Sequence, residues 1–194
     1  MFSLVCSHMS TLVYVTHSNV TTESNSLAGT IPFELEQLTE LQVLSLEQGT
    51  TGSSIPSNLG TLSNLRILDL DFNQITGPIP EQIYGLTNLE QLDLNTNKIT
   101  GTISNNMGNL ASLRLFQLYE NLMTGTVPVS LGNIDSLVIV EFFNNTFTGT
   151  MPQAVCDNRA PPTGTGSITG LTADCFPNPV PQIICNCCTG CAVF

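Results

Sequence analysis

The segment LRILDLDFNQITGPIPEQIYGLTN, from Leu65 to Asn88, contains the pattern that decides the fold. In this segment the first, fourth and sixth positions are apolar, and the fourth and sixth share one face of an extended chain. A single short strand with one apolar face is not stable alone, so each copy must pack against another. The pattern recurs every 24 residues without insertions, and its copies begin at Leu41, Leu65, Leu89, Leu113 and Leu137. The repeat therefore predicts stacked coils.

Two further positions of the repeat predict the bends of each coil. The ninth position is asparagine in four copies, where the strand ends and the chain must turn, and a side-chain amide can bond to the backbone of its own and neighbouring coils. Glycine at the thirteenth position permits a second tight bend. A proline near the sixteenth position limits the following segment to short 3-10 or extended structure. We expect an asparagine ladder formed by Asn73, Asn97, Asn121 and Asn145.

The full pattern, LxxLxLxxNxLTGxIPxxLGxLxx, resembles the plant-type leucine-rich repeat of receptor-kinase ectodomains, receptor-like proteins and polygalacturonase inhibitors. The resemblance covers residues 12–155 and implies an α/β solenoid of about six coils. Its right-handed superhelix would carry a concave parallel β-sheet, with short 3-10 or extended segments on the convex side. We therefore divide the chain into an N-terminal segment without an assigned role (1–11), a repeat domain (12–155) and a cysteine-rich C-terminal cap (156–194).

The first coil fits the strict register poorly. Aligning Leu12 and Val15 with the first and fourth positions gives a better strand, LVYVTH, and requires about five extra residues before Gly29. We interpret these extra residues as an exposed inserted loop, which carries an N-glycosylation sequon at Asn19. A second sequon begins at Asn144, in the last regular coil. In the next coil Gly49 replaces the ladder asparagine, so we expect a looser turn there.

Six of the seven cysteines lie in the cap, which also contains the stretch RAPPTGTGSITG that we expect to be flexible. The dense clustering predicts a disulfide framework that covers the open end of the solenoid, and disulfides are typical of oxidising compartments. No histidine accompanies the CNCCTGC motif, so we favour disulfides over zinc and predict no metal and no cofactor. The framework cysteines are Cys156, Cys175, Cys185, Cys187, Cys188 and Cys191.

Composition excludes several classes of function. Fifteen acidic and four basic residues give a net charge of -11, which argues against a nucleic-acid partner. No apolar stretch is long enough to span a membrane. The first residues lack a basic n-region, so either export is directed by sequence not present here or this segment belongs to the fold. Catalytic motifs of the hydrolase, nucleotide-binding and metalloprotease types are absent from the sequence, and we expect no enzymatic activity.

The candidate site consists of the strand positions that face solvent between the buried leucines. Asp69 and Asp93 should stand about 5 Å apart on adjacent strands, which is unfavourable without a counter-charge. A Lys or Arg of a partner would supply one, Ca²⁺ would be another, and a solvated acidic face is the alternative; we favour the latter over calcium. Tyr119 and Phe143 form either a binding hot spot or a pair that packs across strands. The candidate residues are Glu47, Asp69, Asp71, Phe72, Asp93, Tyr119, Glu120, Glu141 and Phe143.

These features favour an extracellular or cell-surface recognition module that binds a protein or a peptide, including a basic one, through its concave face. Two other functions stay open: a structural or adhesive extracellular scaffold, and an inhibitor of a secreted polysaccharide-degrading enzyme.

Overall fold

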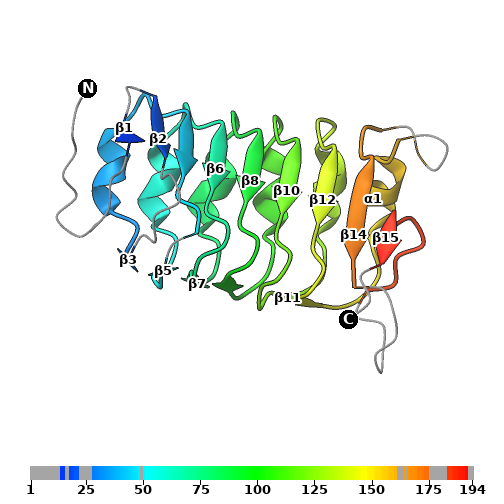
Figure 1. The fold of residues 1–194 in the computed structure, drawn as a ribbon. Coiled ribbons are helices and arrows are strands. Elements are labelled where there is room, and N and C mark those ends of the chain that lie inside the picture. The colour runs from blue at the N-terminus through cyan, green and yellow to red at the C-terminus, as the bar shows by residue number, and fades with distance from the viewer. Residues whose placement is uncertain are drawn as a thin grey trace.

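Each coil contributes one strand to a nine-stranded sheet that runs the length of the molecule (Figure 1). The computed structural model describes residues 14–15, 18–21, 28–48, 50–160, 164, 166–174 and 183–191. Neighbouring strands are parallel except for the first pair, β1 and β2. In sheet order the strands are β1 (Tyr14–Val15), β2 (Asn19–Thr21), β4 (Val43–Ser45), β6 (Ile67–Asp69), β8 (Gln91–Asp93), β10 (Leu115–Gln117), β12 (Ile139–Glu141), β14 (Gly170–Ala173) and β15 (Gly190–Cys191).

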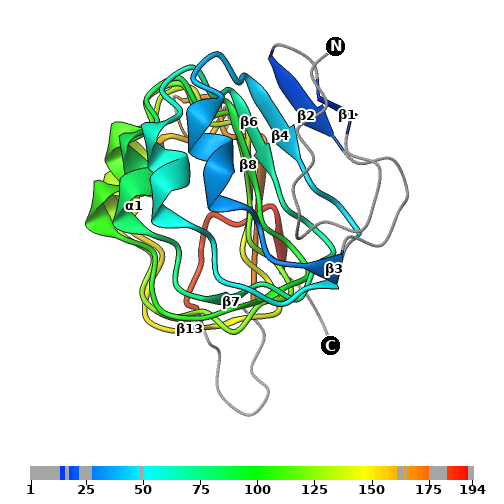
Figure 2. The same cartoon turned by 90° about the vertical axis from the view of Figure 1, so that its left-hand side faces the viewer.

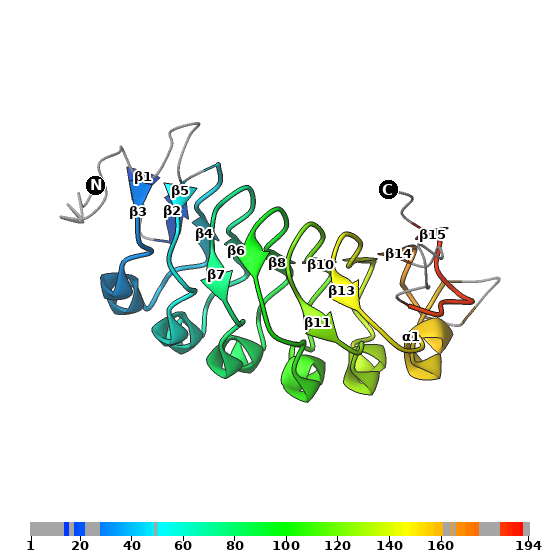
Figure 3. The same ribbon diagram turned by 90° about the horizontal axis from the view of Figure 1, so that it is seen from below.

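Short helices form the side of each coil opposite the sheet, along the outer side of a gentle curve (Figure 3). Five of them are 3-10 helices of five residues, and four of these five follow a proline. This confirms the fold class expected from the repeat. The helices are η1 (Phe33–Gln37), η2 (Ser57–Thr61), η3 (Glu81–Gly85), η4 (Asn105–Asn109), η5 (Val129–Asn133) and α1 (Gln153–Asp157).

A third side of the coil carries two-residue strands that pair in parallel (Figure 2). They lie between the end of the long sheet and the helices, so the coil has three distinct faces. The pairs are β3 (Ala28–Gly29) with β5 (Thr50–Thr51), β7 (Thr76–Gly77) with β9 (Lys98–Ile99), and β11 (Thr124–Gly125) with β13 (Thr146–Phe147).

The core is a stack of equivalent apolar side chains. At the fourth position of successive coils, Leu44, Leu68, Leu92, Phe116 and Val140 are all fully buried. Toward the C-terminus aromatic rings replace leucines, and the rings of Phe116 and Phe142 meet edge to face with centroids 6.1 Å apart. Truncating one of the buried leucines to alanine would cost about 2 to 5 kcal/mol.

The ninth-position asparagines join neighbouring coils through their side-chain amides. Asn97 Nδ2 donates to the carbonyl oxygens of Leu70, Leu94 and Asn95, while its Oδ1 accepts from the Ile75 amide at 2.9 Å. Asn121 and Asn145 repeat this arrangement one and two coils further along. Each amide therefore satisfies buried backbone groups of two coils.

The first coil corrects our interpretation of the N-terminal region. Val20, in the strict 24-residue register, pairs with Leu44 and is 1% exposed, so it fills the core position that we assigned to Val15. Asn19 lies in strand β2 and not in an inserted loop, although it is exposed. The strict register matches the sequence poorly because it places the polar residues His17 and Thr22 at apolar positions, yet the pairing of Val20 with Leu44 follows it. The turn expected at Gly49 falls outside the described residues.

The cap continues the solenoid as well as covering it. Strand β14 adds to β12, and the Asp174 carboxylate accepts from the amides of Asn144 and Asn145 at 2.8 and 3.1 Å. In the preceding coil, backbone carbonyls accept the equivalent amides, so Asp174 replaces the coil that would come next. The stretch that we expected to be flexible contains Ile168, which is fully buried, and Gly170 in β14; this part of the expectation was wrong.

Disulfides hold the cap to the last coil. Cys156, in α1, is bonded to Cys187, and Cys185 is bonded to Cys188. Cys191 is also disulfide-bonded, whereas Cys175 lies outside the described residues. The disulfides expected in the cap are thus present at the five described cysteines, and the longer of the two bonds given above spans 31 residues.

Candidate ligand-binding face

The candidate site lies on the concave face of the sheet, formed by the fifth, seventh and eighth positions of the coils. The eighth residue of every regular coil has a positive φ, between 49° and 57°, although none is glycine. This left-handed conformation is held by bonds between coils, such as those from the Phe72 amide to the Asn95 carbonyl and from the Thr96 amide to the Tyr119 carbonyl. Sequence reasoning missed this turn because no glycine marks it. The residues are Gln48, Phe72, Thr96, Glu120 and Asn144.

Three aspartates meet at the centre of this face. Asp69 and Asp93 are direct neighbours on β6 and β8, and one carboxylate oxygen from each of Asp69, Asp71 and Asp93 lies within 4.8 Å of the others. We expected all three to face solvent, but Asp93 is only 6% exposed. Its Oδ1 accepts from the backbone and side-chain amides of Asn95, which is itself buried. The side-chain amide explains how a carboxylate is tolerated there.

Burial and mutual repulsion raise the pKa values of the three clustered aspartates above that of an ordinary aspartate. Burial, followed by the charges of Asp71 and Asp93, raises the pKa of Asp69 to about 7. Burial and the charges of Asp93 and Glu47 raise the pKa of Asp71 to about 6, and the pKa of Asp93 is raised chiefly by burial. Within the described part of the chain, no basic side chain contributes to these shifts. A positively charged side chain of a partner would therefore be stabilised by these carboxylates, because no basic side chain of the described residues compensates for their charge.

Asp69, Asp71 and Asp93 are also the described residues that could hold a metal ion. Calcium takes about six to eight oxygen ligands, and two oxygens of this cluster already accept hydrogen bonds: Asp93 Oδ1 from Asn95, and Asp69 Oδ1 from the Asp71 amide. Further ligands would have to come from water or a partner. Asp71 Oδ1 is buried without a hydrogen-bond partner among the described residues.

The rings of Tyr119 and Phe143 lie beside the aspartates and stack on each other. Their centroids are 4.6 Å apart and their planes differ by 5°, and both side chains remain partly exposed. Burial, followed by the charges of Asp93 and Glu141, raises the pKa of Tyr119. The rings thus pack across strands, as one interpretation expected, and still present apolar surface next to the acidic cluster.

The other candidate residues surround these two groups and are held by bonds across the face. Glu47 accepts from the Ser45 hydroxyl at 2.8 Å, and Glu141 accepts from the Gln117 side chain at 2.6 Å. Glu120 accepts from the Thr96 hydroxyl at 3.1 Å. Phe72 is 51% exposed, which makes it the most accessible ring of the face.

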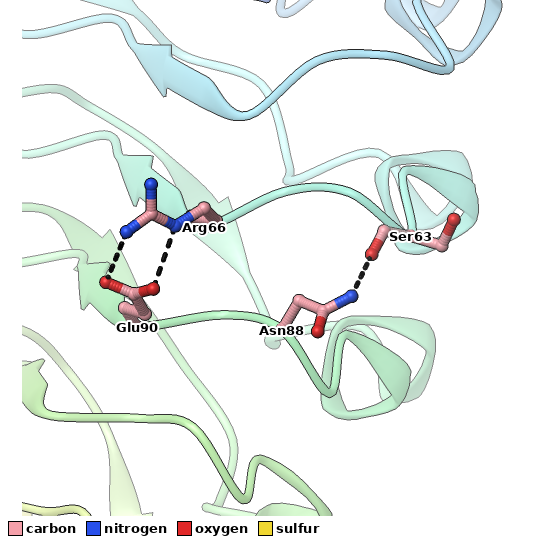
Figure 4. A network of polar contacts seen from close by, with 4 residues as sticks. All are labelled: Ser63, Arg66, Asn88 and Glu90. Carbon is pink, nitrogen blue, oxygen red and sulfur yellow. Dashed lines mark hydrogen bonds and ion pairs between the residues drawn. The ribbon is translucent and has the colours of Figure 1, made fainter.

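Basic side chains are directed elsewhere, as the contacts at the second position of the coils show (Figure 4). Arg66 forms a two-pronged ion pair with Glu90 of the next coil, with nitrogen–oxygen distances of 2.8 and 3.0 Å. The Asn88 amide donates to the Ser63 carbonyl beside it. The Arg66 hydrogen bonds hold the pKa of Glu90 below its ordinary value. Exposed ion pairs of this kind contribute little to stability. This pair nevertheless neutralises the Arg66 guanidinium with the Glu90 carboxylate.

Comparison with known proteins places the chain among leucine-rich-repeat proteins. The Leucine rich repeat family matches residues 39–99 and 63–123. The plant peptide hormone receptor RGFR1, solved in complex with RGF2, is 33% identical over 81% of this chain and 24% of that chain, with a TM-score of 0.73. The BIR3–SERK2 complex from Arabidopsis thaliana contains a chain that is 32% identical over 67% of this chain and 69% of its own length, with a TM-score of 0.59.

A plant ice-binding protein is also similar, at 27% identity over 80% of this chain and 46% of that chain, with a TM-score of 0.66. None of the curated proteins matches the chain. The chain belongs to the plant-type leucine-rich-repeat family. It spans between 15% and 24% of the receptor ectodomains RGFR1, GASSHO1, PEPR1 and TDR. Among the described residues, none of the helices has the length and hydrophobicity of a membrane span.

Proposed function

We propose that this protein is a non-enzymatic recognition module of the extracellular space or cell surface, and that its concave face binds a protein or peptide with a basic side chain. The observation that carries the proposal is the juxtaposition of three aspartates with a stacked aromatic pair on a face that lacks basic partners. A lysine or arginine would enter the aspartate cluster, and an apolar neighbour would cover the rings. The likeness to a receptor solved with its peptide hormone supports a peptide as the ligand class.

A displayed library of random peptides, selected against the immobilised full chain, tests this proposal. We expect selected peptides to contain Lys or Arg, to bind more weakly at high salt, and to lose at least about tenfold in affinity on Asp71→Asn. Tyr119→Ala should weaken the same peptides. Glu40→Gln and Phe33→Ala, which change an exposed acid and an exposed ring away from this face, are the matched controls. Peptides that bind all variants equally would place recognition elsewhere.

The same experiment separates the two alternatives. A scaffold would select no peptide above background. An inhibitor of a wall-degrading enzyme would reduce the activity of an added endopolygalacturonase, and unchanged activity would count against that function.

As a second candidate function, we propose that the chain binds ice. The likeness to a plant ice-binding protein over 80% of this chain favours it. The concave face is unsuited to ice because it is irregular and carries the aspartate cluster, so another face would have to do so. Thermal hysteresis of the purified chain, the gap between its melting and freezing points, tests this function directly.

A further inference from the structure

The short-strand side of the solenoid presents a regular array of threonines. Three consecutive coils read KITGT (98–102), LMTGT (122–126) and TFTGT (146–150), and this side faces the viewer in Figure 3. Strands β11 and β13 place Thr124 directly beside Thr146. Seven exposed residues define what we call the threonine face. Three coils repeat a pair at the same two positions, and Thr146 lies beside them; the pairs are Thr100 and Thr102, Thr124 and Thr126, and Thr148 and Thr150.

Hydrogen bonds fix three of these side chains in the same way. The hydroxyl of Thr124 donates to the Gly101 carbonyl, that of Thr146 to the Met123 carbonyl, and that of Thr148 to the Gly125 carbonyl. In each case the backbone amide of the same threonine donates to the same carbonyl. The hydroxyls of these three exposed threonines are thus bonded within the protein, which restricts the orientation of the side chains. Because threonine is also stiff about χ1, little entropy remains to be lost on binding.

Glycines of the next coil leave space for two further threonines of this face, Thr102 and Thr126. A Cβ at Gly125 would stand 2.8 Å from the Thr102 methyl carbon, and a Cβ at Gly149 would stand 3.2 Å from the Thr126 methyl carbon. Both glycines have a positive φ, of 83° and 90°. The threonine methyl groups therefore lie over the glycines of the next coil, in space that any other residue would fill. Methyl groups and glycine backbone thus pack together along this side.

This face is nearly free of charge in a strongly acidic chain. Within the three segments that form it, Lys98 is the single charged residue, and its amine is bonded to Gln74. The exposed apolar side chains Leu122 and Ile184, 55% and 52% exposed, extend the surface. Ile184 joins it through a backbone bond to Gly149. This side therefore offers little charge to a partner and repeats from coil to coil, which suits an uncharged, periodic surface.

We infer that the threonine face binds the surface of ice, an inference that rests on the second proposed function. Thr124 and Thr146 are direct neighbours on adjacent strands, and such strands lie about 4.8 Å apart, a spacing close to the shorter lattice repeat of hexagonal ice. The order of the side chains exists before binding, so the face presents a ready template for a crystal layer.

Thermal hysteresis and recovery in a growing ice hemisphere, measured on the full chain and its variants, test this inference. Wild type should show both activities. Thr124→Lys and Thr148→Lys should each reduce them, and the double variant should fall to the buffer baseline. Thr87→Lys, an exposed threonine away from this face, is the matched control and should match wild type. Thr124→Val, which keeps the methyl group, should retain more activity than Thr124→Ser, which keeps the hydroxyl.

The outcomes separate the face from the function. An inactive wild type would overturn both the ice-binding function and this inference. An active wild type with equally active lysine variants would keep the function and refute this face, and loss of activity in Asp71→Asn would move the site to the concave face. Circular dichroism must show that each variant is folded. Concentration-dependent dimerisation that the lysine variants abolish, without hysteresis, would assign the face to a second copy of the chain.

Discussion

Neutralising Asp69 is expected to stabilise the protein above neutral pH. In the folded chain the pKa of this carboxyl is about 7, against 3.8 in an unperturbed chain, because it is largely buried beside Asp71 and Asp93. The folded state therefore holds the proton more tightly than the unfolded state does. As pH rises from about 4 to 7, the unfolded chain ionises first and stability is lost; above pH 7 the loss is complete.

The size of this loss follows from the pKa difference. A difference of about three units corresponds to roughly 4 kcal/mol, and partial exposure to solvent reduces the expected loss to about 2 kcal/mol. Asp69→Asn mimics the protonated form, so it should be about 2 kcal/mol more stable than wild type at pH 8 and nearly equal to it at pH 4. In a chain of this size, that corresponds to a difference in melting temperature of roughly 4 to 8 °C.

Calorimetric unfolding of wild type and Asp69→Asn at pH 4, 6 and 8 measures this effect, with Glu40→Gln as the exposed-acid control. The difference between wild type and Asp69→Asn should grow with pH, while the control should track wild type throughout. A variant that is less stable than wild type at pH 8, or a difference that does not change with pH, would show that the charge of Asp69 is already compensated. The argument for a cationic partner would then fail.

Further variants test the scaffold. Asn97→Ala removes four buried hydrogen bonds and should cost about 4 kcal/mol in thermal or urea unfolding, whereas Asn88→Ala, which removes one exposed bond, should cost less than about 1 kcal/mol. Replacing Cys156 and Cys187 by alanine opens a link spanning 31 residues and should cost about 3 to 4 kcal/mol; unchanged stability would mean that the cap holds without it. Gly125→Val forces a branched side chain into a positive φ and should lower the melting temperature measurably.

The coils could be predicted from the sequence because one requirement, burial of equivalent positions, repeats in every copy. Leu68 and Leu92 share the environment that their shared position implies, and so do the ladder asparagines. The first coil was misjudged because its polar residues outweighed Val20, and only the paired strand reveals that Val20 follows the strict register. Asp174 shows a different limit: it contacts residues about thirty positions away, and nothing in the local sequence indicates that contact.

The neighbours on the concave face could be predicted from the sequence, but the burial of their side chains could not, and the use of this face for binding stays a prediction. Position in the repeat predicted that Asp69 and Asp93 would be neighbours. It could not predict that Asp93 is buried, since that depends on Asn95 and on side chains of the following coils. The threonines were visible in the sequence as well, but they were overlooked because the glycine between them already explained the bend.

The two candidate faces differ in the one property that a solenoid controls best, its regularity. At the fifth and seventh positions, successive coils carry different side chains, from aspartates to a stacked Tyr119–Phe143 pair, so this face has a fixed register and can distinguish one end of an aperiodic ligand from the other. At the twelfth and fourteenth positions, three coils repeat the same threonines, so this face has no register and can match only a ligand that is itself periodic. A peptide satisfies the first requirement and a crystal satisfies the second. Because different residues carry the two faces, substitutions on one should leave the other intact, and the two proposals can be tested separately in a single protein.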